Sequence, residues 1–360
     1  MKKIIKVMVV DDSALVRKVM AEVLNSDPEI EVVSQAVDPI FALEKMKKIT
    51  PDVITLDIEM PRMDGITFLK KLMSENPLPV VICSSLAREN ADTTLSALRA
   101  GAVDIITKPE IGVKGFIQES AIQIIDAVKG AAQAKVTKRK PGVINTEEKC
   151  NADVVLRKNR NKAMRETTDK IIAIGASTGG TEALRQVLSA MPATSPGIVI
   201  VQHMPEKFTH TFANHLNEIC DIEVREAVSG DRMHSGLALI APGGRHLLLK
   251  RSGAQYCVEV VDGPLVSRHR PSVDVLFRSV ARYAGSNTAA CLMTGMGDDG
   301  ATGLKEIRES GGRTFAQDEE TSVVFGMPKE AWKRNAAEKL LALQDIANVL
   351  LKSCNDISKR

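Results

Sequence analysis

The sequence predicts two α/β domains, each built on a mostly parallel β-sheet, and three observations support this prediction. Short apolar runs alternate with amphipathic helical patterns in both halves of the chain, which is typical of βα units. The length of 360 residues is more than one ordinary core of roughly 100–200 residues requires. Residues 126–168 are polar, basic and without hydrophobic periodicity, which is typical of a linker.

The first domain is expected over residues 1–125. Its apolar runs predict five strands, and the amphipathic patterns between them predict the connecting helices. Parallel strands need such crossovers, so the alternation favours a parallel sheet covered on both faces. The strands are expected at 5–10, 31–36, 53–57, 79–83 and 103–106.

The second domain is expected over residues 169–357 and repeats this alternation, which favours a doubly wound, mostly parallel sheet. Residues 246–261 differ, because two runs flank a turn at Gly253 and so predict a hairpin. A last helix is expected at 337–353. The other strands are expected at 171–174, 198–201, 237–240 and 289–293, and the other helices near 181–190, 208–217, 272–283 and 300–310.

The composition narrows the class of protein. Aromatic residues make up 3% of the chain, too few for a surface on which nucleic-acid bases stack. The net charge of +3 reflects the region 135–170, which holds eleven Lys and Arg against five Asp and Glu, so no basic face for nucleic acid is expected. Six scattered cysteines predict reduced thiols, and no apolar run approaches the ~20 residues of a membrane span. We therefore expect a cytoplasmic protein that is not itself inserted in a membrane.

Polar side chains follow four strands of the first domain. Asp11 and Asp12 come directly after the first strand, and Asp57 ends the third. Three carboxylates at one edge of a sheet repel each other unless a cation neutralises them, and oxygen ligands suit Mg²⁺. Ser84 and Lys108 follow the fourth and fifth strands. A helix cap or a surface role would explain any one of these residues, but not the four strand ends together.

This order of residues resembles the receiver domain of two-component response regulators. The resemblance covers residues 4–125 and implies a flavodoxin-like (βα)₅ fold. It implies that Asp57 is the phosphoacceptor and that Asp11, Asp12 and Asp57 hold Mg²⁺. It also implies two residues that contact the phosphoryl group, Ser84 and Lys108.

Three strands of the second domain end in residues that are typical of serine hydrolases. Ser177 lies in a glycine-rich turn after the first strand, His203 follows the second, and Asp299 follows the strand at 289–293. A serine hydroxyl needs a positioned base to take its proton, and the base needs a carboxylate partner. These residues therefore predict a nucleophile, a base and an orienting acid, with the adjacent Asp298 as the alternative acid.

The glycine-rich turn has a second interpretation, because such turns also bind phosphate. Residues 175–179 match the nucleophile pattern G-x-S-x-G, but fit neither G-x-G-x-x-G nor a P-loop. The chain order Ser, His, Asp differs from that of α/β-hydrolases, so that fold is not inferred. The alternative function is a receiver-controlled phosphate- or nucleotide-binding module without hydrolase activity. A transcription regulator is disfavoured, because the output region has no helix-turn-helix pattern.

Five motifs of the second domain resemble the catalytic domain of the bacterial chemotaxis protein-glutamate methylesterase family. The resemblance implies a triad of Ser177, His203 and Asp299. Hydrolysis would also need donors for an oxyanion, and the backbone N–H groups after Ser177 and near Met296 are alternative candidates. The motifs are Gly-Ala-Ser-Thr-Gly-Gly at 175–180, Gln-His-Met-Pro at 202–205, Ala-Pro-Gly-Gly at 241–244, Arg-Pro-Ser-Val-Asp-Val-Leu-Phe at 270–277 and Thr-Gly-Met-Gly-Asp-Asp-Gly at 294–300.

The resemblance also implies what such a chain does. The implied activity is hydrolysis of glutamate methyl esters on methyl-accepting chemotaxis receptors, which releases methanol and gives adaptation, together with deamidation of certain receptor glutamines. Mg²⁺ is implied for receiver phosphorylation, and no cofactor for ester hydrolysis. The implied phosphodonor is the chemotaxis histidine kinase. Phosphorylation of Asp57 is expected to release a hydrolase cleft that the unphosphorylated receiver restrains.

Overall fold

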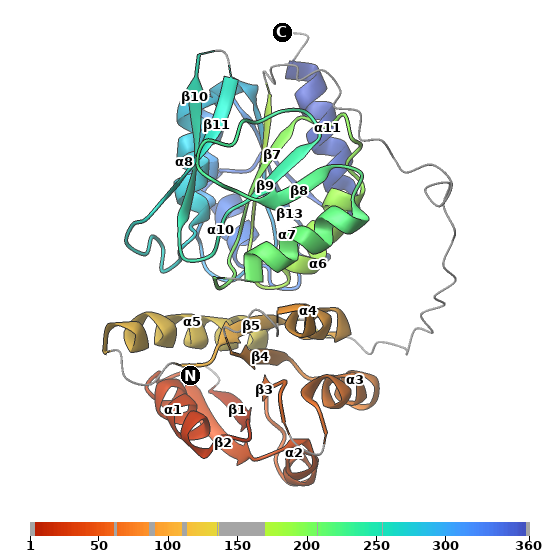
Figure 1. Cartoon of the computed structure of the whole chain (residues 1–360), viewed down its shortest axis with the longest axis vertical. Coiled ribbons are helices and arrows are strands. Elements are labelled where there is room, and N and C mark those ends of the chain that lie inside the picture. The colour runs from red at the N-terminus through yellow and green to blue at the C-terminus, as the bar shows by residue number, and fades with distance from the viewer. Residues whose placement is uncertain are drawn as a thin grey trace.

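The computed structural model describes residues 4–60, 63–85, 91–109, 114–134, 136, 170–206, 208–253 and 255–357. Figure 1 shows two domains, with the N-terminal one coloured red to gold and the C-terminal one green to blue. Both have the parallel α/β architecture that the sequence predicts. Among the described residues, no helix is long and apolar enough to cross a membrane.

The N-terminal domain is a five-stranded parallel sheet in the order β2-β1-β3-β4-β5. All five predicted strands are confirmed within one residue at each end. The strands are β1 (Ile5–Val10), β2 (Ile30–Ala36), β3 (Val53–Asp57), β4 (Val80–Ser84) and β5 (Asp104–Thr107), and the helices are α1 (Ala14–Asn25), α2 (Pro39–Met46), α3 (Gly65–Glu75), α4 (Ala91–Ala100) and α5 (Lys114–Gln133).

Helices cover both faces of this sheet because successive strand residues point to opposite sides. In β1, Val7 and Val9 pack in one cluster with residues of α1 and α5. Met8 and Val10 pack in another with residues of α2, α3 and α4. Strands buried on both faces explain why the sequence shows continuous apolar runs here instead of alternation.

Helix α5 ends at Gln133, beyond the boundary expected at residue 125. Its last turns are helical and not linker, because Val128 and Ala131 are buried against the sheet. Residues 137–168, most of the expected linker, lie outside the described residues.

The C-terminal domain holds a seven-stranded parallel sheet in the order β14-β13-β12-β6-β7-β9-β8 and a separate antiparallel hairpin, β10-β11. The hairpin and the four predicted strands are confirmed. The strands are β6 (Ile171–Ala176), β7 (Gly197–Gln202), β8 (Glu223–Glu226), β9 (Leu237–Ile240), β10 (His246–Ser252), β11 (Gln255–Val261), β12 (Thr288–Leu292), β13 (Arg313–Gln317) and β14 (Lys339–Leu341), and the α-helices are α6 (Gly180–Ser189), α7 (Phe208–Ile219), α8 (Val273–Tyr283), α9 (Ala301–Glu309), α10 (Met327–Lys333) and α11 (Ile346–Ile357).

The helix predicted at 337–353 is wrong over its first half. Residues Lys339–Leu341 form β14, which pairs in parallel with β13, and α11 begins only at Ile346. A run of three strand residues is too short to show a period, so pairing with a distant strand decides its conformation.

In the second sheet, successive strands are added on one side of β6 and then on its other side. The chain runs outward from β6 through β7 and then returns to place β12 on the other side of β6. Ligands of open α/β sheets bind outside the carboxyl ends of strands at such a switch point. Figure 1 shows α4, α5 and β5 of the N-terminal domain facing this end of the second domain.

Candidate functional site

The backbone at Ser177 is fixed in a sharp turn between β6 and α6. The Ser177 N–H donates to the Thr294 carbonyl at 2.9 Å, and its own carbonyl accepts from Gly180 N–H at 2.7 Å. Gly179 has φ +78°, a left-handed conformation that favours glycine. A Cβ on Gly180 would lie 2.1 Å from Gln202 Oε1. The two glycines therefore permit the turn that places Ser177 at the end of the strand.

His203 and Asp299 form a buried pair beside this turn. His203 Nε2 lies 2.8 Å from Asp299 Oδ2, and the two side chains are only 8% and 1% exposed. The other ring nitrogen of His203, Nδ1, is buried without a hydrogen-bond partner among the described residues. Ser177 makes no hydrogen bond to it in this part of the chain, although both residues line one cavity. Nδ1 is thus the ring nitrogen left to accept a proton.

Asp299 is held by the N-terminus of α8. Ser272 Oγ and the Asp274 N–H donate to Oδ1 at 2.8 and 3.1 Å, and the Val273 N–H donates to Oδ2 at 2.7 Å. Burial alone would raise the pKa of Asp299, but the hydrogen bond and charge of His203 and the Val273 N–H hold it below its ordinary value. The positive end of the helix dipole favours the same ionised form.

The structure separates the two adjacent aspartates. Asp298 has a side chain that is 53% exposed and pairs with Arg334, whereas Asp299 is buried against His203. Asp299 is therefore the carboxylate that can orient the His203 ring.

A second imidazole, which the sequence did not single out, stacks on the first. The rings of His203 and His269 have centroids 3.7 Å apart and planes inclined by 12°. Burial, together with the charge of His203, lowers the pKa of His269 to about 3, so this ring is neutral. Its flat face fixes the plane of the His203 ring. No local pattern marks His269, because the contact joins two distant loops.

Several backbone N–H groups of residues that line the cavity have no acceptor among the described residues, and two of them lie near Ser177 in the chain or the fold. They belong to Thr178, directly after Ser177, and to Met296, and both residues line the cavity with Ser177 and His203. Unpaired N–H donors next to a nucleophile are what an oxyanion requires. The N–H group of Met296 and that of Thr178 in the turn after Ser177 are thus both available to bind an oxyanion.

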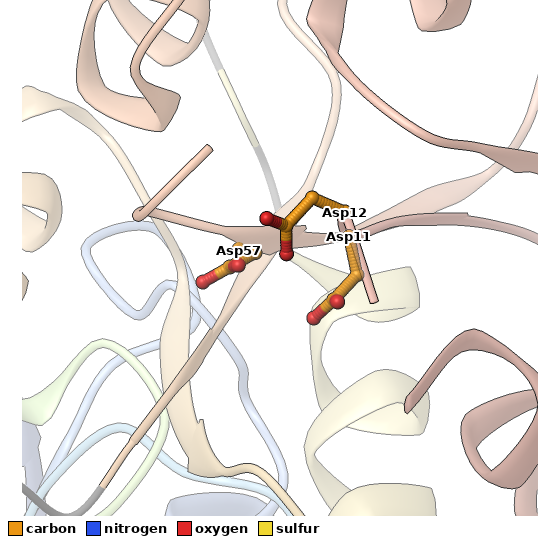
Figure 2. Close-up of side chains that lie close together, drawn as sticks. All are labelled: Asp11, Asp12 and Asp57. Carbon is orange, nitrogen blue, oxygen red and sulfur yellow. The ribbon is translucent and has the colours of Figure 1, made fainter. Parts of the chain in front are cut away.

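The acidic cluster of the N-terminal domain lies at the carboxyl ends of β1 and β3. Asp11, Asp12 and Asp57 each bring a carboxylate oxygen within 4.8 Å of the others. Figure 2 shows the three side chains close together. Lys108 Nζ lies 2.7 Å from Asp57 Oδ2 and 3.1 Å from Asp11 Oδ2. Burial raises the pKa of Asp57, and the hydrogen bond and charge of Lys108 oppose that rise. Ser84 Oγ shares a hydrogen bond with Thr94 of α4 at 3.0 Å.

This donor set fits a small hard cation. Three carboxylate oxygens converge, and Asp12 is exposed while Asp11 and Asp57 are buried. Mg²⁺ prefers a few carboxylate ligands and keeps several waters, so one open side suits it.

The two domains meet over the serine site. A cavity of about 440 Å³ is lined by both domains, including Asp104, Asp126, Ser177, His203 and Arg268. Thr178 Oγ1 donates to Asp104 Oδ2 at 2.7 Å, and Arg268 Nη1 lies 3.4 Å from Asp126 Oδ1. Burial raises the pKa of Asp104 to about 6, against the hydrogen bond from Thr178. With Ser177 only 8% exposed, this arrangement covers the serine.

Helix α5 approaches the serine turn closely at a glycine. A Cβ on Gly130 would lie 3.1 Å from Thr178 Oγ1 and 3.4 Å from Met296 Cβ. The absence of a side chain at Gly130 therefore lets the helix rest against the turn.

Both domains are similar to those of known protein families. Residues 172–350 match the family model of the CheB methylesterase, and residues 7–115 match that of the response regulator receiver domain. The chain is 59% identical to "Protein-glutamate methylesterase/protein-glutamine glutaminase 3" of Geobacter metallireducens, over 98% of this chain and 100% of that one. It is also 59% identical to a relative of the same name, numbered 1, from Xanthomonas oryzae, over 95% of this chain and 99% of that one.

A solved structure is similar to the second domain. The Thermotoga maritima CheB methylesterase catalytic domain is 36% identical, with a TM-score of 0.50, and the match covers 51% of this chain and 97% of that one.

Proposed function

The chain belongs to the protein-glutamate methylesterase/protein-glutamine glutaminase family, and we propose that Ser177, His203 and Asp299 carry its hydrolysis. Its substrates are then glutamate methyl esters, and certain glutamines, of chemotaxis receptors. The observation that carries the triad is the buried His203–Asp299 pair, whose free ring nitrogen shares a cavity with Ser177. A phosphate-binding module would have no need of such a pair.

The first step forms an acyl-enzyme. His203 takes the proton of Ser177 Oγ, which attacks the carbonyl carbon of the ester. The negative charge that develops on the carbonyl oxygen is met by the Thr178 and Met296 N–H groups. The bond to the methoxy group then breaks, and methanol leaves with the proton that His203 held. Asp299 stabilises the imidazolium that exists between these two events.

The second step frees the product. Water replaces methanol, gives a proton to His203 and attacks the acyl carbon through the same oxyanion. The bond to Ser177 breaks, Ser177 recovers its proton from His203, and the glutamic acid side chain departs and gives its remaining acidic proton to water. A glutamine side chain follows the same course and releases ammonia, because its carbonyl has similar geometry.

We also propose that the receiver domain controls access to the serine. Asp57 is the phosphoacceptor for a chemotaxis histidine kinase, with Asp11, Asp12 and Asp57 as the residues that would hold Mg²⁺. The cation would neutralise charge on the transferred phosphoryl group. Lys108 already pairs with Asp57. Ser84, bonded to Thr94 of α4, links the phosphorylation site to a helix that packs near α6 and α7.

A cytoplasmic location is part of this proposal. All five cysteines that lie among the described residues are free thiols, and oxidising compartments favour disulfides.

The triad is tested by methanol release from methylated receptor membranes. We expect Ser177→Ala to lower the rate by at least about 10³-fold, as loss of a nucleophile does. The matched control is Ser189→Ala, at an exposed serine of α6, which should keep the wild-type rate. Normal release by Ser177→Ala would remove the serine from the mechanism and favour the binding-module alternative.

A further inference from the structure

We propose that the Thr178 hydroxyl and the Arg268 guanidinium recognise the substrate, and that the receiver domain occupies both groups with carboxylates of its own, Asp104 and Asp126. In this scheme Thr178 binds the acyl group of the modified glutamate, and Arg268 binds an acidic side chain near it in the receptor segment. The inference rests on the proposed function and adds two specificity-determining residues to it.

Thr178 is placed to touch the reacting group. It directly follows Ser177, and its carbonyl accepts from Thr294 Oγ1 at 3.0 Å, which fixes the residue. The Thr178 side chain is buried. Its hydroxyl donates a hydrogen bond to Asp104 Oδ2 at 2.7 Å. Asp104 lies in the same cavity as Ser177 and His203.

The chemistry of Asp104 explains why it sits there. An aspartate carboxylate is the same functional group as the glutamate carboxylate that hydrolysis produces. A site shaped to release such a group can also accept one from the receiver domain. In this scheme Asp104, hydrogen-bonded to the Thr178 hydroxyl in the cavity that Ser177 also lines, is a mimic of the product.

Arg268 stands on a strained turn beside the same site. Val266 and His269 exchange both backbone hydrogen bonds, at 3.0 and 2.9 Å, and close a two-residue hairpin turn. Ser267 and Arg268 have φ values of 51° and 69°, which residues with side chains rarely adopt and which recur at functional sites. The turn carries His269, which stacks on His203. The strained backbone of this turn therefore positions His269, which contacts the ring of the proposed base, His203.

The contact between Arg268 and Asp126 is easily exchanged. The Arg268 side chain is 69% exposed and its nearest oxygen on Asp126 is 3.4 Å away, a geometry that binds weakly. Two other charged residues at the cavity are held more firmly: Arg270 donates to the Gly263 carbonyl at 2.6 Å, and Asp298 pairs with Arg334. Glu206 also lines the cavity. When the receiver domain moves away, Arg268 remains at the cavity as a cation suited to a carboxylate.

A purely structural role makes a different prediction. If Thr178 and Arg268 only hold the domains together, substituting them should change the rate of methanol release as much as substituting their partners Asp104 and Asp126 does. If Thr178 and Arg268 also bind substrate, only their substitution should raise KM once the receiver domain has been released.

The experiment uses the full chain, with and without a small-molecule phosphodonor and Mg²⁺, and measures kcat and KM for methanol release. We expect Asp104→Ala and Asp126→Ala to raise the unphosphorylated rate and to leave the phosphorylated KM unchanged. Thr178→Val should raise the phosphorylated KM by about two- to tenfold, the value of one hydrogen bond to an uncharged acyl group. Arg268→Gln should raise it about two- to fivefold, since the site is exposed.

Two controls separate recognition from folding. Thr178→Ser keeps the hydroxyl and should restore the wild-type KM, whereas a merely misfolded turn would not be rescued. In the receptor, changing the acidic residues that flank the modified glutamate to Gln should raise KM for the wild-type enzyme. It should leave KM of Arg268→Gln unchanged, because that variant has already lost the proposed ion pair between Arg268 and the receptor.

An unchanged phosphorylated KM in both Thr178→Val and Arg268→Gln would overturn the inference while methanol release by the wild type still supported the triad. Loss of the Ser177 dependence would instead overturn the proposed function.

Discussion

His203 Nε2 lies 2.8 Å from Asp299 Oδ2, and the N-terminus of α8 holds Asp299 in place. This relationship joins three segments that are far apart in sequence. The loop after β7 supplies His203, the proposed base, the loop after β12 supplies Asp299, and the start of α8 supplies the N–H donors. The helix thus keeps a buried carboxylate ionised where the base needs a negative partner.

Asp299→Asn tests the orienting role. The amide can no longer stabilise an imidazolium and would present a donor to His203, so we expect kcat to fall by about 10³- to 10⁴-fold. Asp298→Asn is the matched control, because its exposed side chain pairs with Arg334 instead, and it should retain at least half of the wild-type rate. Equal losses in the two variants would contradict the assignment.

Ser272→Ala tests the support of that carboxylate. Ser272 caps α8 and also donates to Asp299, so its loss should cost about 1 kcal/mol of unfolding free energy. Denaturant unfolding measures this loss. We also expect kcat to fall several-fold and Ser272→Thr to recover most of it. A stability loss without any fall in kcat would show that the cap is only structural.

Gly130→Ala tests the contact of α5 with the serine turn. Alanine is the better helix former, but its Cβ would press on Thr178 Oγ1 and Met296. Overpacking of this kind costs about 1 kcal/mol or more, so the interface should loosen and the unphosphorylated rate should rise about fivefold. Gln133→Ala, at an exposed position of α5, is the control. A rate no higher than wild type in Gly130→Ala would place the inhibitory contact elsewhere.

The contact between Asp104 and Thr178 should depend on pH. Burial raises the pKa of Asp104 from 3.8 to about 6 in this arrangement, against the hydrogen bond from Thr178. A raised carboxyl pKa favours the closed arrangement at low pH, and this contribution is lost as pH rises through about 6. The closed arrangement should therefore weaken about tenfold between pH 5 and pH 7.

The readout is the unphosphorylated rate of the wild type divided by that of Asp104→Asn, which cancels the pH dependence of catalysis itself. This ratio should rise with pH and level off above pH 7. A flat ratio would mean that Asp104 does not titrate at the interface.

Much of the fold could be predicted because its signals are local. The five strands of the first domain are continuous apolar runs with polar ends, and those ends lie together in a parallel sheet. Residues Lys339–Leu341 could not be assigned, since their pairing with β13 is a contact made at long range. The last turns of α5 were missed for a similar reason, because burial of Val128 and Ala131 extends the helix.

The residues of the site likewise fall into those with a local signal in the sequence and those placed by long-range contacts. Ser177, His203 and Asp299 each follow a strand, so their types and positions predicted a shared site. His269 and Arg268 lie on a loop whose position depends on packing against both domains. No spacing in the sequence could have predicted a neutral ring stacked on the base or a cation shared with the receiver domain.

The central claim is that Ser177 hydrolyses receptor esters under control of Asp57. Methanol release from methylated receptor membranes tests it most directly, with the wild type, Ser177→Ala and Asp57→Asn compared before and after addition of a phosphodonor and Mg²⁺. We predict that the phosphodonor stimulates the wild type, that Asp57→Asn stays at the unstimulated rate, and that Ser177→Ala releases no methanol in either condition. Release by Ser177→Ala at the wild-type rate, or equal stimulation of Asp57→Asn, would contradict the account.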